Sequence, residues 1–276
     1  MISYMKIYKY AVKSREFQIL INNKMKNNEY KIPIHFAFGH EFISALVKAN
    51  FDSSKDKLFL THRNIHFTSI FSKDSKKNYF NFKKKKSIKL SFGSMNYLDK
   101  NSNIIYTSSI LGNNLSVACG YSQIQKKNSL TFCVIGDGGI EEGTFYETIL
   151  LAKYLNLNII FIIENNNWSM FTSINQRRCK INLQKISSAV NCSYYYFKRS
   201  SIKENIKKFS FIVNNSRKVS NPVICEFDVK TIGSYKKNNR FFNYHHGPMN
   251  LEFEDKIFFK KNYTDILYLM KTQLTE

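Results

Sequence analysis

The chain of 276 residues is 43% hydrophobic, a length and composition that predict one globular domain over residues 1–276 with a single large core. Its 42 Lys and Arg against 20 Asp and Glu give a formal charge of +22. Asn, Ile, Phe and Tyr, which A/T-rich codons encode, are also abundant, and no nucleic-acid motif is present. A/T-rich codons, which also encode Lys, therefore explain the excess of positive charge better than a nucleic-acid partner does. With no apolar run of about 18 residues, no charged-then-apolar leader and no C-x-x-C spacing among the five cysteines, we expect no membrane span and a reducing, cytoplasmic compartment.

The first half of the chain predicts helices separated by a long loop. Residues 1–30 are expected to form a helical N-terminal arm, whose Lys and Asn clusters mark frayed or partner-facing surface. A helix over residues 40–50 follows. Residues 72–103 are polar and rich in Lys and Asn, which predicts a loop bordering a site, with the Lys83–Lys86 run as a solvated part of it. Leu115–Gln125 is expected to be a helix beside the next strand.

Two apolar runs in the middle of the chain predict adjacent buried strands. Leu130–Ile135 is short, continuous and rich in β-branched and aromatic residues, which suits a strand buried on both faces of a parallel sheet. Glu141 to about Leu155 has the apolar spacing of an amphipathic helix. Leu157–Ile163 is the second buried run. This strand–helix–strand order predicts an α/β fold with a parallel sheet.

Glycine and polar residues follow both runs. Gly136, Gly138 and Gly139 allow positive φ and let main-chain N–H groups approach a phosphate. Asp137 offers the hard oxygen that Mg²⁺ prefers, and Asn166 follows the second strand at the same edge of the sheet. Together these residues predict a site for a metal-bound diphosphate; the plainer alternative is a βαβ unit with polar turns.

The rest of the chain predicts one more strand and two peripheral segments. Ile174–Lys185 is polar and is expected to be mobile until a cofactor binds. Pro222–Val229 is expected to be a late core strand. The tail from Leu251 is expected to be a helix for subunit contact.

The segment from Gly136 to Thr172, GDGGIEEGTFYETILLAKYLNLNIIFIIENNNWSMFT, resembles the thiamine diphosphate motif of the α subunit of 2-oxo acid dehydrogenase complexes, of the pyruvate and acetoin dehydrogenase type. Other segments resemble that family in the same order. They are His35 with Gly39-His40-Glu41, Thr61-His62-Arg63, Gly93-Ser94-Met95, Ser109-Ile110-Leu111-Gly112 and Tyr244-His245-His246-Gly247-Pro248. The resemblance covers residues 30–250 and implies a thiamine diphosphate-binding fold, a parallel sheet with helices on both faces.

The resemblance also implies roles for individual residues. Mg²⁺ would be held by Asp137, Asn166 and the carbonyl oxygen of Trp168. Thiamine diphosphate would be bound by His62, Arg63, Leu111, Gly136, Gly138, Gly139 and Asn166. Three histidines are candidates for catalysis, because imidazole transfers protons near neutral pH: His66, His245 and His246. For each histidine the alternative is an exposed or structural side chain.

A partner chain is implied as well. In this family the diphosphate-binding and pyrimidine-binding halves are separate domains, and the chain is too short to hold both. We therefore expect a β-type subunit, which carries the pyrimidine domain and the activating glutamate, in an α2β2 heterotetramer. The assembled enzyme would decarboxylate a 2-oxo acid and transfer the acyl or aldehyde unit to an acceptor. A lipoyl acyltransferase is a further partner if that acceptor is lipoamide.

Four positions depart from the family pattern. His40 stands where Gln is usual, Asn96 replaces a His, and Glu141-Glu142 replaces Asn-Gln. With these departures the chain looks more like dehydrogenase-α-like proteins of sugar and surface-polysaccharide gene sets. Two alternatives therefore stay open. One is the N-terminal half of a split transketolase-like enzyme, and the other is a degenerate, non-catalytic subunit or a basic binding protein on the same fold.

Overall fold

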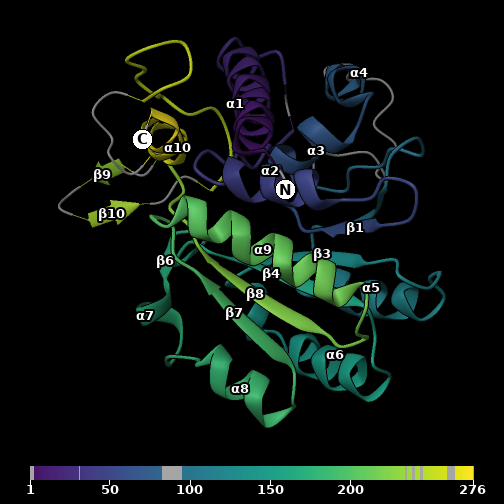
Figure 1. The fold of residues 1–276 in the computed structure, drawn as a ribbon. Helices are drawn as coiled ribbons and strands as arrows, with labels where there is room; N and C mark the ends of the chain where they lie inside the picture. The colour runs from purple at the N-terminus through teal and green to yellow at the C-terminus, as the bar shows by residue number, and fades with distance from the viewer. Residues whose placement is uncertain are drawn as a thin grey trace.

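A six-stranded parallel sheet forms the centre of the molecule (Figure 1). The computed structural model describes residues 3–30, 32–82, 95–233, 235–237, 240–242, 245–259 and 265–275. The strands follow the order β2-β1-β3-β4-β8-β7. Their bounds are Lys57–Leu60 for β1, Ile104–Thr107 for β2, Thr131–Gly136 for β3, Ile159–Asn165 for β4, Ser193–Phe197 for β7 and Val223–Asp228 for β8. The predicted α/β fold with a parallel sheet is confirmed.

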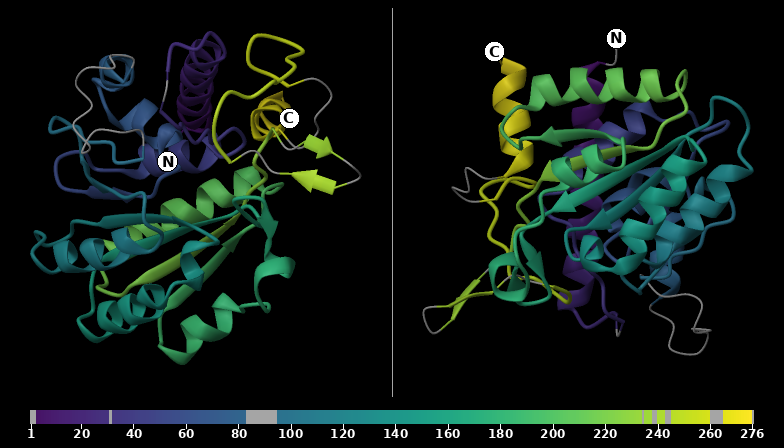
Figure 2. Two further views of the ribbon diagram at one scale, coloured as in Figure 1. Left: turned by 180° about the vertical axis from the view of Figure 1, so that it is seen from behind. Right: turned by 90° about the horizontal axis from the view of Figure 1, so that it is seen from below.

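Helices cover both faces of the sheet (Figures 1 and 2). On one side lie α1 (Tyr4–Lys26), α2 (Glu41–Asn50), α3 (Ile65–Phe71), α9 (Ile202–Ser216) and α10 (Ile266–Thr275). On the other lie α5 (Asn113–Gln123), α6 (Gly143–Tyr154) and α8 (Leu183–Ala189). The shorter elements are α4 (Ser75–Asn81), η1 (Gly139–Glu141), β5 (Trp168–Ser169), β6 (Thr172–Ser173), α7 (Ile174–Arg177), β9 (Tyr235–Lys237) and β10 (Arg240–Phe242). Within the described ranges, no helix combines the length and the apolar character that a membrane span requires.

β3 is buried on both faces because successive side chains join different cores. Phe132 and Val134 pack on the side of α1, α2 and α9, whereas Cys133 and Ile135 pack on the side of α5 and α6. β4 pairs with β3 in parallel and is buried in the same way. Burial on both faces requires a continuous apolar sequence, which is why both strands were predictable; their ends lie within two residues of the predicted ones.

The N-terminal segment is helical as expected, but it packs into the core instead of projecting as an arm. α1 lies against α2, α3 and α10. Its Arg15 is fully buried, and the guanidinium binds the carboxylates of Glu41 (Nε–Oε1 2.5 Å) and Asp265 (Nη2–Oδ1 2.9 Å). The Lys residues that suggested a partner-facing surface lie on the solvent side of the same helix. Arg15 therefore ties the N-terminal helix to the starts of α2 and α10.

Several peripheral segments differ from the sequence-based expectation. Ile174–Lys185, predicted to be a mobile loop, contains α7 and the start of α8; Ser173 and Gln176 form a capping box that stabilises α7. α4 lies within the predicted loop 72–103, and in the described part of the tail the helix is α10, Ile266–Thr275. β2, β7 and α9 were not predicted. The Lys83–Lys86 run and, of the resemblance, Gly93, Ser94 and Tyr244 lie outside the described residues.

The Arg15 ion pairs generate a stability prediction. Arg15→Met should lower the free energy of unfolding by about 3–5 kcal/mol, because it leaves two buried carboxylates without a cation. Lys26→Met, at an exposed position of the same helix, should change it by less than about 0.5 kcal/mol. Urea unfolding of both variants measures the difference. A loss below about 1 kcal/mol for Arg15→Met would show that the buried network is dispensable.

Candidate functional site

A pocket of about 230 Å³ lies at the C-terminal ends of β3 and β4, the edge where parallel sheets form ligand crevices. It is lined by most of the residues singled out in the sequence: His62, Arg63, Leu111, Gly136, Asp137, Gly138, Gly139, Asn166, Trp168 and His245. The lining also includes residues to which the sequence analysis gave no role: His35, His40, Thr61, Met95, Ser109, Glu164, Ser169 and Met170. His66 and His246 do not line it.

Asp137 and Asn166 reach this pocket together because of the strand register. β3 pairs with β4 up to Gly136 opposite Glu164, so both chains leave the sheet side by side. The Asn166 side chain is held at both ends. Its Oδ1 accepts from the Trp168 N–H at 3.0 Å, and its Nδ2 donates to Thr231 Oγ1 at 2.7 Å. One carboxylate and one amide oxygen at a single sheet edge form a donor set that suits Mg²⁺.

A guanidinium stands beside the candidate metal ligand. Arg177 on α7 donates from Nη2 to Asp137 Oδ2 at 2.6 Å and from Nε to Glu141 Oε1 at 2.7 Å. Arg178 donates to the same Glu141 oxygen at 2.6 Å. Burial raises the pKa of Asp137, and Arg177 opposes that rise. Asp137 is thus a buried carboxylate whose negative charge is paired with the Arg177 guanidinium, at the place where a metal ion would otherwise bind.

The glycines of the turn act through space and not through positive φ. Gly136, Gly138 and Gly139 are not among the residues with positive φ, and Gly138 has φ −70°. The positive φ that these glycines allow is not used, because Gly136 ends β3 and the chain then turns directly into the right-handed η1 helix. A Cβ at Gly138 would lie 3.0 Å from Ser169 Oγ, so a side chain here would crowd the pocket wall. Positive φ occurs instead at Gly112 (74°), where a Cβ would lie 2.5 Å from Thr144 Oγ1.

Arg63 supplies a buried positive charge to the pocket. The Arg63 side chain is buried, and its guanidinium donates to the Phe36 carbonyl oxygen. Burial lowers the pKa of Arg63 to about 10, and the carboxylates of Glu164 and Asp137 oppose that shift. The side chain stays charged at neutral pH. Among the described residues, no carboxylate lies within ion-pair distance of its guanidinium. An anionic ligand would supply the missing counter-charge.

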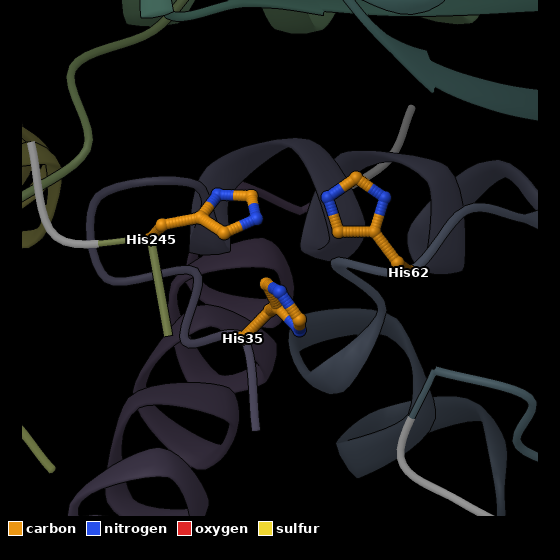
Figure 3. A group of neighbouring side chains, drawn as sticks. All are labelled: His35, His62 and His245. Carbon is orange, nitrogen blue, oxygen red and sulfur yellow. The ribbon is translucent and has the colours of Figure 1, made fainter. Parts of the chain in front are cut away.

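Three histidines from distant segments meet at the pocket (Figure 3). The ring of His35 lies 4.9 Å from that of His62 and 4.6 Å from that of His245, centroid to centroid, with nearly perpendicular planes. Burial, and after it the charge of Arg63, lower the pKa of His62 to about 3 and that of His245 to about 4; the pKa of His35 is also lowered, chiefly by burial. All three imidazoles are therefore neutral at pH 7.

The surroundings of the trio favour an oxygen-rich ligand over a metal ion. The ring nitrogens of His35, His62 and His245 lie within 4.8 Å of one another, a spacing that could hold a metal. The positive charge of Arg63 acts on all three rings, however, and it repels a dication as it repels an added proton. His35 Nδ1 is buried without a partner among the described residues. The trio thus offers neutral donors and acceptors beside a cation.

His66 and His246, expected near the mouth, have other positions. His66 is fully buried in α3, and its Nε2 lies 2.7 Å from Glu164 Oε1. The expectation that it lines the mouth was wrong because the first turn of α3 directs this side chain inward, under β4. His246 is exposed, although its ring lies 5.6 Å from that of His35. Of the three histidines proposed for catalysis, only His245 faces the pocket.

Glu164 is the main functional candidate that the sequence did not reveal. It ends the apolar run of β4, is 3% exposed and lies between two imidazoles, 2.7 Å from His66 Nε2 and 3.3 Å from His40 Nδ1. Burial opposes its ionisation, but the two histidines hold the pKa of Glu164 below its usual range. The available signal was a carboxylate that ends an apolar strand, together with His40 and His66 upstream as possible partners for it.

The sequence is similar to that of a known protein family. The family model described as dehydrogenase E1 component matches residues 9–193. The α subunit of acetoin:2,6-dichlorophenolindophenol oxidoreductase from Bacillus subtilis is 31% identical over 83 residues, 29% of this chain and 25% of that protein. The pyruvate dehydrogenase E1 component α subunit of Rickettsia typhi is 28% identical over 142 residues, 50% of this chain and 43% of that protein.

Solved structures share the fold. Transketolase from Leishmania mexicana superimposes with a TM-score of 0.67 at 15% identity, covering 98% of this chain and 44% of that one. Transketolase from Campylobacter jejuni gives a TM-score of 0.64 at 15% identity, covering 88% of this chain and 41% of that one. In each of these comparisons the match spans less than half the length of the other protein.

The Arg177–Asp137 contact predicts competition with metal ions. Arg177→Ala should tighten binding of Mn²⁺ about tenfold, a change of about 1.4 kcal/mol, since a cation no longer has to displace the guanidinium. Arg178→Ala is the matched control, because Arg178 contacts Glu141 but not Asp137. Electron paramagnetic resonance titration measures the free Mn²⁺. Equal affinities for the two variants would contradict the competition.

Proposed function

The chain belongs to the dehydrogenase E1 component family, and we propose that it is the α subunit of a heteromeric, thiamine diphosphate-dependent enzyme. That enzyme decarboxylates a 2-oxo acid and transfers the acyl or aldehyde unit to an acceptor. The observation that carries the proposal is the pocket itself, where Asp137 and Asn166 leave adjacent strands beside the buried guanidinium of Arg63. The matched relatives are α subunits of pyruvate dehydrogenase and of an acetoin oxidoreductase, which supports the same role.

The residues present fit the cofactor and its metal. Asp137, Asn166 and the Trp168 carbonyl oxygen would hold Mg²⁺, an oxygen donor set that the ion prefers. The buried charge of Arg63 and the N–H groups of Gly138 and Gly139 would face the diphosphate, and a side chain at Gly138 would fill that space. The remaining cofactor contacts are assigned to Gly136, to His62 and, on the pyrimidine side, to Leu111, all of which line the pocket. When bound, thiamine diphosphate supplies the carbanion chemistry that decarboxylation needs.

This chain's own groups would bind the substrate and move its protons. A 2-oxo acid brings a carboxylate, and Arg63 with the neutral imidazoles of His35 and His62 offers a positive field and hydrogen bonds for it. His245 is neutral at pH 7 and partly buried at the pocket, so it can accept a proton there and return it. His66 lies outside the pocket, so we assign it a structural role at Glu164.

A second subunit completes the proposal. The carboxylates that line the described part of the pocket, Asp137 and Glu164, are already bound to Arg177 and to two histidines. Activation of the aminopyrimidine therefore requires a glutamate from elsewhere, which we place on a β-type partner in an α2β2 assembly. Met170 in the pocket lining and Ile110 beside it are 56% and 64% exposed and offer apolar surface for that partner.

One observation favours a second candidate, the N-terminal half of a split transketolase-like enzyme. The trio of His35, His62 and His245 presents neutral hydrogen-bonding groups that suit a hydroxylated sugar as well as a 2-oxo acid. The acceptor would then be an aldehyde and not the lipoamide of a lipoyl acyltransferase. Assays of carbon dioxide release from 2-oxo acids, and of ketol transfer between sugars, separate the two with the assembled enzyme.

The proposal predicts the metal and cofactor requirement. Asp137→Ala and Asn166→Ala should each weaken Mg²⁺-dependent thiamine diphosphate binding by at least about a hundredfold, because each removes a metal ligand. Asn165→Ala is the matched control: Asn165 is the neighbouring amide, but it binds Glu226 and does not line the pocket. Calorimetry with the assembled enzyme measures the affinities. Unchanged affinity in either pocket variant would refute the site.

The two adjacent histidines give a kinetic prediction. His245→Ala should lower kcat by about 10²–10⁴-fold, the usual effect of losing a general acid or base, while cofactor affinity changes little. His246→Ala should keep near-normal kcat because its side chain is exposed and outside the pocket. Steady-state kinetics on the assembled enzyme compare them. A wild-type kcat for His245→Ala would remove His245 from the mechanism.

A further inference from the structure

We propose that His40 and Thr231 are positioning residues that fix the side-chain amide of Asn166 in the orientation that metal binding requires. The inference rests on the proposed role of Asn166 as a metal ligand. An asparagine binds a metal through Oδ1 only, and a flipped amide presents N–H groups that a cation repels. Whatever sets the amide orientation therefore sets the metal affinity.

A continuous chain of polar contacts leads from Glu164 to this amide. Glu164 Oε2 lies 3.3 Å from His40 Nδ1. On the other side of the ring, His40 Nε2 lies 2.8 Å from Thr231 Oγ1, which in turn lies 2.7 Å from Asn166 Nδ2. Glu164, His40 and Thr231 are each at most 5% exposed, so water does not compete for these contacts. The chain links three separate elements: the end of β4, the start of α2 and the loop after β8.

The direction of each hydrogen bond follows from the chemistry of its groups. The Glu164 carboxylate carries no proton to donate, so its position 3.3 Å from His40 Nδ1 favours the tautomer with the proton on Nδ1, although the angle at this contact falls short of a hydrogen bond. A neutral imidazole then keeps Nε2 as an acceptor, and burial, which lowers the pKa of His40, favours that neutral form. The Thr231 hydroxyl must therefore donate to His40, which leaves Oγ1 only its lone pairs for Asn166. A lone pair accepts from an amide N–H, so Asn166 must turn Nδ2 toward Thr231.

The other end of the amide gives the same orientation independently. The Trp168 backbone N–H can only donate, and it lies 3.0 Å from Asn166 Oδ1. Oδ1 has a second lone pair that this contact leaves open for a cation. The two constraints come from different segments and agree, so the amide is fixed before any metal arrives.

The residue at position 40 fits this reading. His40 stands where glutamine is usual in the resembling family. Glutamine also carries one donor group and one acceptor oxygen, so it can donate to Glu164 and accept from Thr231 in the same direction. A residue of similar size without hydrogen-bonding atoms, such as leucine, cannot. The relay therefore predicts that His40→Gln is tolerated and His40→Leu is not.

The test measures Mn²⁺ affinity of the assembled enzyme in the presence of thiamine diphosphate, by electron paramagnetic resonance. Thr231→Val removes the hydroxyl without changing the size of the side chain and should raise the Kd for Mn²⁺ about tenfold or more. His40→Leu should do the same. Thr231→Ser and His40→Gln, which keep the polar groups, should stay within about threefold of wild type. Raising the Mn²⁺ concentration should restore cofactor affinity in Thr231→Val, an outcome that damage to the pocket would not give.

Thermal unfolding of all four variants controls for folding, and the Thr231→Val and Thr231→Ser pair decides the question if His40→Leu does not fold. Wild-type Mn²⁺ affinity in Thr231→Val would overturn the relay while leaving the proposed function intact. Equal loss in Thr231→Val and Thr231→Ser would also overturn it, since the hydroxyl would then not be the operative group. Failure of the wild-type enzyme to bind Mn²⁺ with thiamine diphosphate would overturn both proposals.

Discussion

The parallel pairing of β3 with β4 is the constraint on which the site depends. Its register, with Gly136 opposite Glu164, places Asp137 and Asn166 at one edge and Glu164 beneath them. A slip of one residue would turn every side chain of the strand to the opposite face of the sheet. It would also separate the Asp137 carboxylate from the Asn166 amide. Because both strands are buried on both faces, that slip would mispack apolar side chains against the helices on each side of the sheet. The same apolar burial that stabilises the fold therefore also fixes the site.

Buried charges in this protein are arranged in pairs that link distant segments. Arg15 holds Glu41 and Asp265, and this pair anchors the start of α2, the turn that also carries His40. Glu164 lies between His40 and His66, and Asp137 holds Arg177. Arg63 differs from these groups, since it is enclosed and charged yet has no carboxylate at ion-pair distance in the described part of the chain. The positive charge in the pocket thus lacks a counter-charge, which the proposed diphosphate or 2-oxo acid would supply.

The sequence was sufficient for the parts of the site that depend on local pattern. Two apolar runs, each followed by glycine, acid or amide residues, predicted β3, β4, Asp137 and Asn166, because burial on both faces leaves a continuous hydrophobic signal. The sequence was insufficient where contacts between distant segments determine the role of a residue. Glu164 looks like a strand end until His40 and His66, far upstream, are placed around it. The packing of the N-terminal helix against the core likewise depends on the contact of Arg15 with Asp265, near the C-terminus, which no local pattern reveals.

The most direct test of the account is a crystal structure of the assembled enzyme with Mn²⁺ and thiamine diphosphate, in which anomalous scattering locates the metal. One strong peak is expected at coordination distance from both the Asp137 carboxylate and Asn166 Oδ1, with the Arg177 guanidinium displaced from Asp137. A peak among His35, His62 and His245, or a metal bound without Asp137 and Asn166, would contradict it.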